Sequence, residues 1–223
     1  MEQRAQTEQN PGSSTTSKPE LSPPSEWVLR WAHLIPKSTA PETSSAQVHQ
    51  SAEILDLACG QGRHMKWLFE SGRKVLGIDN DPVCVEACRA FGQVLQCDLE
   101  SLQPPLQSAT KGANWPLEGQ VFNGIIVTNY LWRPLWPHIL QSLAENGVLI
   151  YETFSAGQET LGRPRRPEFL LKTGELLQIC VNMRVIAFEE VFLERPDRCI
   201  QRIVAARAQK EVVPARLYRA TSR

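Results

Sequence analysis

Short apolar runs alternate along the chain with segments whose apolar residues follow the helical period. Five such runs, at 53–58, 74–79, 94–97, 121–128 and 148–153, have the length and content of buried strands. The helical segments that precede, separate and follow them are 25–35, a stretch around 65–69, 82–91, 134–144 and 169–181. Strands that alternate with helices predict a parallel sheet with helices on both faces.

The last two strands depart from this alternation. Residues 184–193 and 199–206 both have strand character, and only the short turn at 194–198 separates them. Without a helix between them, these two strands must form an antiparallel hairpin. We therefore expect an α/β fold: a Rossmann-like, seven-stranded, mostly parallel sheet with helices on both faces and a C-terminal antiparallel β-hairpin.

Polar, proline-containing segments delimit the domain. Residues 1–24 contain Gln, Ser, Thr, Pro and Glu with almost nothing apolar, so the sequence predicts a disordered tail there. A single domain is expected over 25–210, followed by a C-terminal tail at 211–223. Within the domain, 37–51 reads as a polar loop and 99–119 as an irregular insertion.

Composition and charge exclude several classes of protein. The 223 residues include 24 Lys and Arg and 24 Asp and Glu, and a net charge of zero disfavours broad binding to nucleic acid or to anionic membranes. No apolar run approaches the length of a membrane helix, and the first residues lack a signal-peptide core. The six cysteines show no metal-site spacing and are expected to be reduced packing residues in a soluble, cytoplasmic protein without a metal.

The chemically most informative segment follows the first strand. That strand ends in Gly60-Gln61-Gly62, which turns directly into a helix. Glycines there permit a positive φ and a close approach of a ligand, and a helix N-terminus attracts an anionic group. The next strand ends in Asp79, where an acid can accept hydrogen bonds from the two hydroxyls of a ribose.

Two cofactors use this layout. A dinucleotide favours a third glycine, but Met65 occupies that position, so the close helix–strand approach over a pyrophosphate is not provided. S-adenosylmethionine instead presents a smaller carboxylate and amine, and Asp56 at the end of the first strand is placed for the amine. The C-terminal hairpin is also typical of class I methyltransferases and not of nicotinamide-binding domains.

The run D-L-A-C-G-Q-G-R-H, followed by G-I-D-N-D-P, resembles the cofactor signature of class I S-adenosylmethionine-dependent methyltransferases. The resemblance covers roughly residues 25–207. The sequence is also similar to small bacterial methyltransferase-domain proteins near the tellurite-resistance type, through S-E-W-V-L-R-W, N-Y-L-W-R-P-L, L-I-Y-E-T-F-S-A-G-Q-E and G-R-P-R-R-P-E-F-L-L-K-T-G-E-L. The family implies the reaction class and leaves the substrate open.

The resemblance also implies roles for individual residues. Asp56, Ala58, Gly60 and Gly62 should line the methionine end of the cofactor. Asp79 should bind the ribose, with Asn80 beside the adenine, and the segment of Asp98 and Leu99 should hold the adenine amino group and pack on its ring. Asn129 and Tyr130 follow the fourth strand on the side to which the methyl group points.

Candidate acceptor residues lie after the fourth and fifth strands. Tyr130 and Arg133 are the first candidates; in the other interpretation, Tyr130 is a packing residue and Arg133 caps a loop carbonyl. The segment lacks the N-P-P-Y motif of methyltransferases that act on the amino groups of bases. Glu152 either faces the cleft or forms an ion pair with Arg163 or Arg165.

Three further features allow two interpretations each. The basic loop 162–166 either binds a phosphate or carboxylate of the acceptor or is a solvated loop paired with Glu159 and Glu168. His64 lies over the cofactor carboxylate or is bonded within a loop. The helix at 25–35 covers the cofactor as a lid, through Trp27 or Trp31, or simply packs on the core.

The expected function is methyl transfer from S-adenosylmethionine to an unidentified, small-molecule acceptor. Positioning supplies much of the catalysis, so the reaction needs no His or Cys constellation. The alternatives are an RNA or protein methyltransferase, a catalytically silent cofactor-binding partner subunit, and a nicotinamide oxidoreductase. The sequence gives no indication of the oligomeric state.

Overall fold

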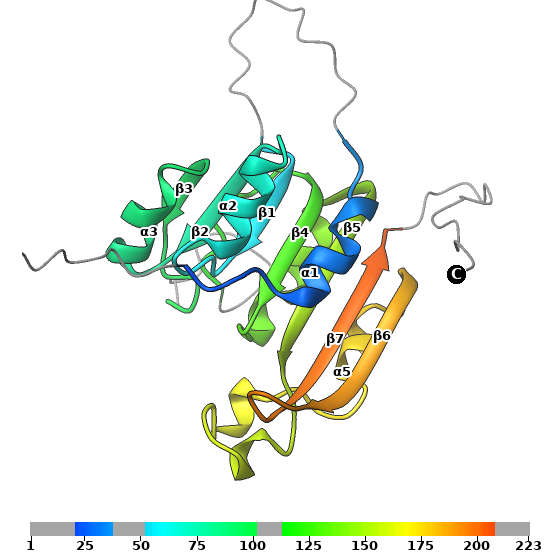
Figure 1. The fold of residues 1–223 in the computed structure, drawn as a ribbon. Helices are drawn as coiled ribbons and strands as arrows, with labels where there is room; N and C mark the ends of the chain where they lie inside the picture. The colour runs from blue at the N-terminus through cyan, green and yellow to red at the C-terminus, as the bar shows by residue number, and fades with distance from the viewer. Residues whose placement is uncertain (1–20, 38–51, 102–112, 208–223) are drawn as a thin grey trace, which may run out of the picture.

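The computed structural model describes residues 21–37, 52–101 and 113–207 (Figure 1). The expected tail at 211–223, all but the last four residues of the tail at 1–24, and the middle of the insertion at 99–119 lie outside the described residues. Over the described parts of the chain, no helix combines the length and apolar character needed to span a membrane. All six cysteines are described and are free thiols.

The seven strands form one sheet, as the sequence predicts. Its order is β3-β2-β1-β4-β5-β7-β6, in which β3 to β5 pair in parallel and β7 pairs antiparallel with both β5 and β6. The strands are β1 (Ile54–Leu57), β2 (Val75–Asp79), β3 (Gln93–Gln96), β4 (Phe122–Thr128), β5 (Leu143–Phe154), β6 (Arg184–Leu193) and β7 (Arg198–Ala206). The C-terminal antiparallel hairpin is therefore confirmed.

Helices cover both faces of the sheet (Figure 1). One face carries α1 (Glu26–Trp31), α2 (Arg63–Glu70) and α3 (Pro82–Cys88), and the other carries α4 (Trp136–Gln141) and α5 (Glu175–Ile179). Four short 3-10 segments complete the described helices: η1 (Ala32–Leu34), η2 (Arg133–Leu135), η3 (Gln158–Thr160) and η4 (Pro167–Phe169).

Alternation along the strands divides the core between these two faces. In β1, Leu55 and Leu57 face α4 and α5, whereas Ile54 packs with α1 and α2. Side chains alternate across a strand, so Asp56 lies on the same face as Ile54. Both apolar sets are fully buried, which explains why the central strands read as continuous apolar runs rather than as alternating ones.

The region between β4 and β5 differs from the prediction. The helix expected at 134–144 is split into η2 and α4 and ends at Gln141, and β5 already begins at Leu143. Asn146 and Gly147, expected as a turn before the strand, lie inside it at a break in register, with Asn146 at φ +61°. The Asn-Gly pair therefore forms an irregularity of the strand, because β4 pairs on both sides of it.

The helix expected at 169–181 is present only in its second half. Leu171 is bound to the end of β5, since its N–H donates to Phe154 O and its carbonyl accepts from Ala156 N, at 3.0 and 2.9 Å. Gly174, at φ +67°, then begins α5. The apolar residues at 170–171 thus face the core from an extended backbone, and tertiary pairing overrides the helical pattern.

Candidate active site

Three neighbouring cavities open along the carboxyl ends of β1, β2, β4 and β5. The strand-end cavity, of about 230 Å³, lies against Asp79, Asp98 and Leu99. The glycine-turn cavity, of about 340 Å³, lies against Gly60, and the arginine-loop cavity, of about 810 Å³, lies against residues 163–166. Tyr130 lines all three, so the cavities meet at its side chain. Ligand sites of open parallel sheets occur at this edge.

The glycine turn is built from left-handed backbone positions. Ala58, Gly60 and Gly62 have φ values of +53°, +54° and +82°. A side-chain carbon placed on Gly60 would meet nothing within 4 Å, whereas one on Gly62 would lie 2.7 Å from Cys88 Sγ. Gly60 therefore keeps backbone open to the cavity, and Gly62 lets α2 start close to α3. Of the predicted turn residues, Ala58 and Gly60 line the glycine-turn cavity, whereas Gly62 does not line it and is the N-cap of α2.

Asp79 ties this turn to the neighbouring strand. Its Oδ2 accepts from Gly60 N at 2.7 Å, and its Oδ1 accepts from Asp81 N at 3.0 Å. A carboxylate offers about four acceptor sites, so two hydrogen bonds leave others available toward the strand-end cavity, which Asp79 and Asn80 line. The acid can thus accept hydrogen bonds from the hydroxyls of a ligand while it fixes the turn.

Met65 takes the position at which a dinucleotide fingerprint has its third glycine. The thioether packs on Gly77 of β2, where an added side-chain carbon would lie 2.4 Å from Met65 Sδ. The close approach of α2 to the sheet is therefore provided after all, by a glycine of the strand instead of one of the helix.

The far wall of the strand-end cavity comes from the segment after β3. Asp98 and Leu99, which were expected to hold the adenine, line it together with Cys97. Leu99 is buried, and Asn114 Nδ2 donates to Asp98 O at 2.9 Å, which holds the segment in place. An apolar surface beside an acid suits a flat heteroaromatic ring with an amino group.

Arg63 was given no role from the sequence, yet it lines the glycine-turn cavity. Its guanidinium lies 3.5 Å from both Pro23 O and Thr128 Oγ1. Burial lowers the pKa of Arg63, while Glu152 and Asp56 raise it, and an arginine stays protonated throughout. The cation thus offers a partner for a ligand carboxylate. The sequence feature that could have indicated this role is the position of Arg63 as the first residue of the helix after the glycine turn.

Asp56 and His64 form a buried pair behind the glycine-turn wall. Asp56 is 1% exposed and lines none of the three cavities, so the structure does not place it at the ligand as expected. His64 Nδ1 lies 3.8 Å from Asp56 Oδ1, and His64 Nε2 accepts from Ser25 N at 3.1 Å. His64 is therefore bonded within the fold and borders the glycine-turn cavity.

The protonation of this pair follows from its surroundings. Burial raises the pKa of Asp56 to about 7, with Arg63 acting in the opposite direction. Burial, supported by Arg63, lowers the pKa of His64 to about 3. Because His64 Nε2 accepts a hydrogen bond, its proton is on Nδ1, which faces Asp56.

Glu152 is not a cleft residue. It is 1% exposed, accepts from Ser25 Oγ at 3.0 Å and pairs with Arg202 at 3.4 Å. The alternatives of a cleft acid and of an ion pair with Arg163 or Arg165 are therefore both wrong. Glu152 lies on the same sheet face as Asp56, because β4 and β5 continue the alternation of β1, and α1 covers it.

Arg133 is likewise not an acceptor residue. It forms a two-pronged pair with Glu175 at 2.7 and 2.8 Å and donates to the carbonyls of Glu168 and Leu170 at 2.6 and 2.8 Å. Hydrogen bonding to Glu175 raises the pKa of Arg133. Its interpretation as a cap for loop carbonyls is the one that the structure supports, and it holds the segment next to the arginine-loop cavity.

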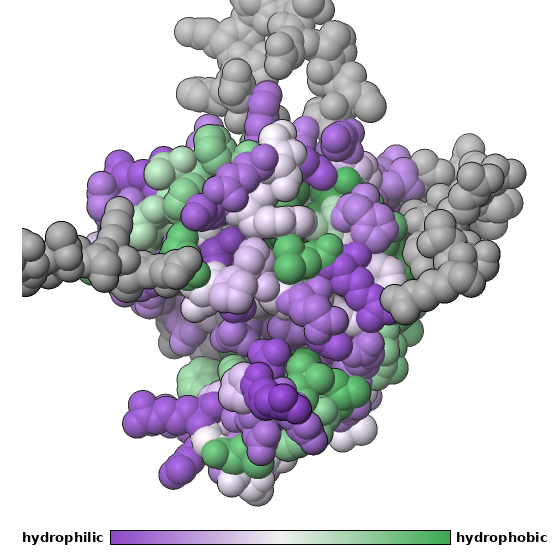
Figure 2. Space-filling model, in the orientation of Figure 1, coloured by the Kyte–Doolittle hydropathy of each residue, from purple (hydrophilic) through white to green (hydrophobic). Residues whose placement is uncertain are grey.

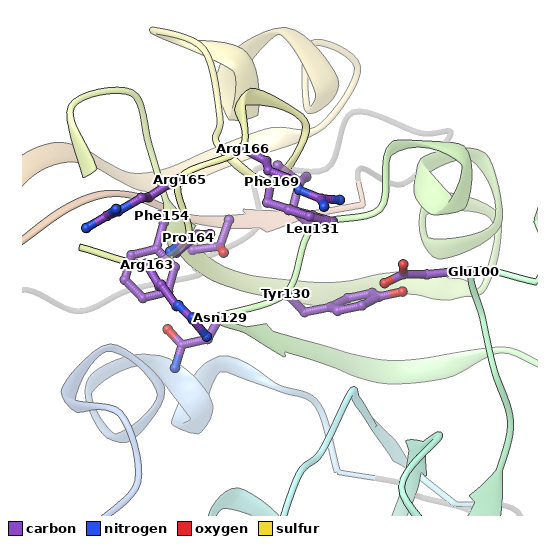
Figure 3. A pocket seen from close by; sticks show the side chains of 11 residues that line it. Glu100, Asn129, Tyr130, Leu131, Phe154, Arg163, Pro164, Arg165, Arg166 and Phe169 are labelled. Atoms are coloured by element: carbon purple, nitrogen blue, oxygen red, sulfur yellow. The ribbon is translucent and has the colours of Figure 1, made fainter. Parts of the chain in front are cut away.

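Asn129 and Tyr130, expected on the side to which the methyl group points, stand where the cavities meet. Asn129, at φ +56°, donates its N–H to Glu152 O at 2.9 Å, and Tyr151 Oη donates to Tyr130 O at 2.6 Å. The Tyr130 ring points toward Glu100 (Figure 3). Burial, and then Glu100, raises the pKa of Tyr130, so its hydroxyl keeps its proton at neutral pH.

The helix α1 packs on the core and is not a lid. Trp27 is fully buried, its Nε1 donates to Ile203 O at 3.3 Å, and the guanidinium of Arg202 lies 4.4 Å from its ring centre. Leu21 and Ser22, just before the helix, line the glycine-turn cavity instead. In the described parts of the chain, no group of His, Cys, Asp and Glu side chains is suited to hold a metal ion.

Part of the chain matches a known protein family. Residues 54–146 match the family model described as a methyltransferase domain. This segment contains the glycine turn, Asp79, Asp98 and Tyr130. A comparison with curated protein sequences gives no match.

Solved structures share the fold at low sequence identity. TehB from Haemophilus influenzae gives a TM-score of 0.55 at 14% identity over 74% of this chain, which spans 60% of TehB. An S-adenosylmethionine-dependent methyltransferase from Methanosarcina mazei gives 0.54 at 14% identity over 73% of this chain and 95% of that one. Magnesium protoporphyrin IX methyltransferase from Synechocystis PCC 6803, with bound SAH, gives 0.51 at 14% identity over 71% and 74%. Residues 54–146 therefore resemble a methyltransferase domain, and the described part of the chain has the fold shared by TehB and these methyltransferases.

Proposed function

We propose that this protein transfers a methyl group from S-adenosylmethionine to a small-molecule acceptor. One observation carries the proposal: Tyr130 lines the two cavities beside the glycine turn and also the larger arginine-loop cavity. A cofactor along the turn and an acceptor against the arginine loop would therefore meet at one side chain.

The polar groups of the two smaller cavities fit the parts of this cofactor. Asp79 suits the ribose hydroxyls, Asp98 and Leu99 suit the adenine, and Arg63 suits the carboxylate of the methionine. The open backbone at Gly60 leaves room for the chain between them. When bound, S-adenosylmethionine supplies a methyl group on a positively charged sulfur.

The residues at the junction then have to position the acceptor. Tyr130 is held through its carbonyl by Tyr151, and Asn129 is held through its N–H by β5. Alignment of the acceptor atom, the methyl carbon and the sulfur lowers the barrier by removing orientational freedom. The arginine-loop cavity has the volume of a small-molecule site, at about 810 Å³, which favours a small acceptor over a macromolecular one.

Two measurements test the proposal. Calorimetry on the purified protein with S-adenosylmethionine, and separately with NAD, should give saturable binding for the first; binding of NAD alone would refute the cofactor assignment. Radiolabelled S-adenosylmethionine is then incubated with the protein and with separate small-metabolite, RNA and protein fractions of a cell extract. Label should pass to the small-metabolite fraction; transfer to RNA or protein, or cofactor binding without transfer to any fraction, would favour the corresponding alternative.

A further inference from the structure

The arginine-loop cavity has an unbalanced charge. Arg163, Arg165 and Arg166 line it, and Glu100 is the one acid among its lining residues in the described structure. The net charge of the whole chain is zero, so this excess of positive charge is local. Guanidinium groups match carboxylate and phosphate oxygens in geometry as well as in charge.

The backbone that carries these arginines is anchored on both sides. Gln158 is 4% exposed; its Nε2 donates to Arg163 O at 3.2 Å and its Oε1 accepts from Cys199 N at 3.0 Å. On the other side, Arg133 holds the carbonyls of Glu168 and Leu170. A loop fixed at both ends loses less conformational freedom when its side chains bind a ligand.

The arginines of the loop also differ from the other arginines near the site in their partners. Arg133 and Arg202 each bind glutamates closely. Arg166 lies 4.0 Å from Glu168, an exposed pair of little energetic weight. For Arg163 and Arg165, the described part of the chain shows no ion pair within 4.0 Å. In Figure 3, Arg163 and Arg166 lie on the Tyr130 side of the loop, and Arg165 points away from Tyr130.

Apolar side chains complete the walls of this cavity. Leu131, Phe154 and Phe169 line it together with Tyr130 (Figure 3). On the face seen in Figure 2, hydrophobic and hydrophilic residues lie side by side around the end of the molecule that carries residues 155–170 in Figure 1. Aromatic walls beside two cations suit a flat apolar ligand that carries an anionic group.

We infer that the acceptor is a small, flat, largely apolar molecule with a carboxylate or phosphate, and that Arg163 and Arg166 bind this anionic group. This inference rests on the proposed function, because it assigns the arginine-loop cavity to the acceptor. The apolar part of the acceptor packs against Phe154 and Phe169, and its methyl-accepting atom points to Tyr130.

The inference is tested with three probes of one shape: 2-naphthoate, 2-naphthyl phosphate and the neutral 2-naphthamide. Their binding to the full chain, saturated with S-adenosylhomocysteine, is measured by calorimetry. We expect at least one anionic probe to bind about tenfold more tightly than the amide, and the carboxylate and phosphate arms show which anion is preferred. The double variant Arg163→Gln/Arg166→Gln should bind all three probes alike.

The controls separate this inference from the proposed function. The double variant should keep the S-adenosylhomocysteine affinity of the original protein, and Arg89→Gln, an exposed charge change just after α3, should keep the preference for the anion. Equal binding of the anions and the amide by the original protein, with cofactor binding intact, would overturn the inference and leave the proposed function standing. Binding of bulk RNA that the double variant loses, while the probes remain unbound, would overturn the inference and would also favour the alternative of an RNA methyltransferase.

Discussion

The carboxylate of Asp79, at the end of β2, accepts a hydrogen bond from the backbone N–H of Gly60, with 2.7 Å between Oδ2 and the nitrogen. One acid therefore both closes the glycine turn and faces the strand-end cavity. The two functions can be separated. Closing the glycine turn needs only an acceptor oxygen, whereas binding a ligand in the strand-end cavity benefits from the negative charge.

We expect Asp79→Asn to retain the fold and to lower the affinity for S-adenosylhomocysteine about tenfold, since an amide offers fewer acceptor sites. Asp79→Ala should lower both that affinity and the free energy of unfolding, the latter by about 1 kcal/mol. Calorimetry and urea unfolding measure the two effects. Glu86→Gln, an exposed acid on α3, is the control, and unchanged affinity in Asp79→Ala would remove Asp79 from the ligand site.

Gly60 and Gly62 should respond differently to the same substitution. Gly62→Ala places a methyl group 2.7 Å from Cys88 Sγ at a positive φ, so the free energy of unfolding should fall by about 2–4 kcal/mol. Gly60→Ala meets no neighbouring atom and should cost only about 1–2 kcal/mol, from the backbone conformation alone. Its methyl group takes up space in the glycine-turn cavity, so cofactor affinity should fall.

Urea unfolding and calorimetry on the two glycine variants provide the comparison. We expect Gly62→Ala to lower the free energy of unfolding more than Gly60→Ala does. Relative to its loss of stability, Gly60→Ala should cause the larger loss of cofactor affinity. The reverse order would show that the open side of Gly60 does not face the ligand.

The buried Asp56–His64 pair predicts an unusual dependence of stability on pH. Between about pH 4 and 6.5 the unfolded chain carries one proton on the pair, on His64, because the ordinary pKa values are 6.5 and 3.8. The folded chain also carries one proton, on Asp56, because its pKa is about 7 and that of His64 is about 3. Because the folded and unfolded states bind the same number of protons, the pair makes no net contribution to the dependence of stability on pH in this range.

Replacing either Asp56 or His64 should reveal the pH dependence of stability that the remaining residue causes. In Asp56→Asn the unfolded state binds one more proton than the folded state, so stability relative to the original protein should fall as pH decreases from about 6.5 to 4. In His64→Asn the folded state binds the extra proton, so relative stability should fall as pH rises from about 4 to 7. In urea unfolding, the relative free energy of unfolding of each variant should change by up to about 1.4 kcal/mol per pH unit. Slopes of the same sign in both variants would contradict the assignment.

Arg133 should affect the order of the arginine loop. Arg133→Ala removes the two-pronged bond to Glu175 and two bonds to loop carbonyls, and we expect it to lower the free energy of unfolding by about 2 kcal/mol. Hydrogen–deuterium exchange should become faster at residues 163–171, while cofactor affinity stays the same. Arg89→Ala, which breaks the exposed pair between the C-cap of α3 and Glu86, should change neither quantity. Unaltered exchange at 163–171 would show that the loop does not depend on Arg133.

The cofactor side of the site was predictable because its residues are defined locally. Gly60, Asp79 and Asp98 lie at or just after the carboxyl ends of β1, β2 and β3, and the parallel sheet brings those strand ends to one edge. Asp56 is the exception, since the alternation that points it to one face does not reveal that His64 covers it.

The residues expected on the acceptor side were harder to place, because distant partners determine their surroundings. Glu152 is held by Ser25 and Arg202, and Arg133 is held by Glu175. The sequence alone does not distinguish an acid at a strand end that faces a cleft from one that a helix N-terminus covers. For the same reason the apolar residues at 170–171 resembled a helix, although the end of β5 holds them in an extended form.

The contact between Met65 and Gly77 bears on how cofactor signatures are compared between proteins. A pattern read along one loop treats the missing third glycine as a loss, yet the space is conserved by a residue twelve positions further on. We expect a bulky residue at position 77 to be tolerated only when position 65 becomes small. A signature written for this pair of positions would require one small residue, either in the helix or in the strand, that lets the two elements approach each other. It would not be a fixed sequence within one loop.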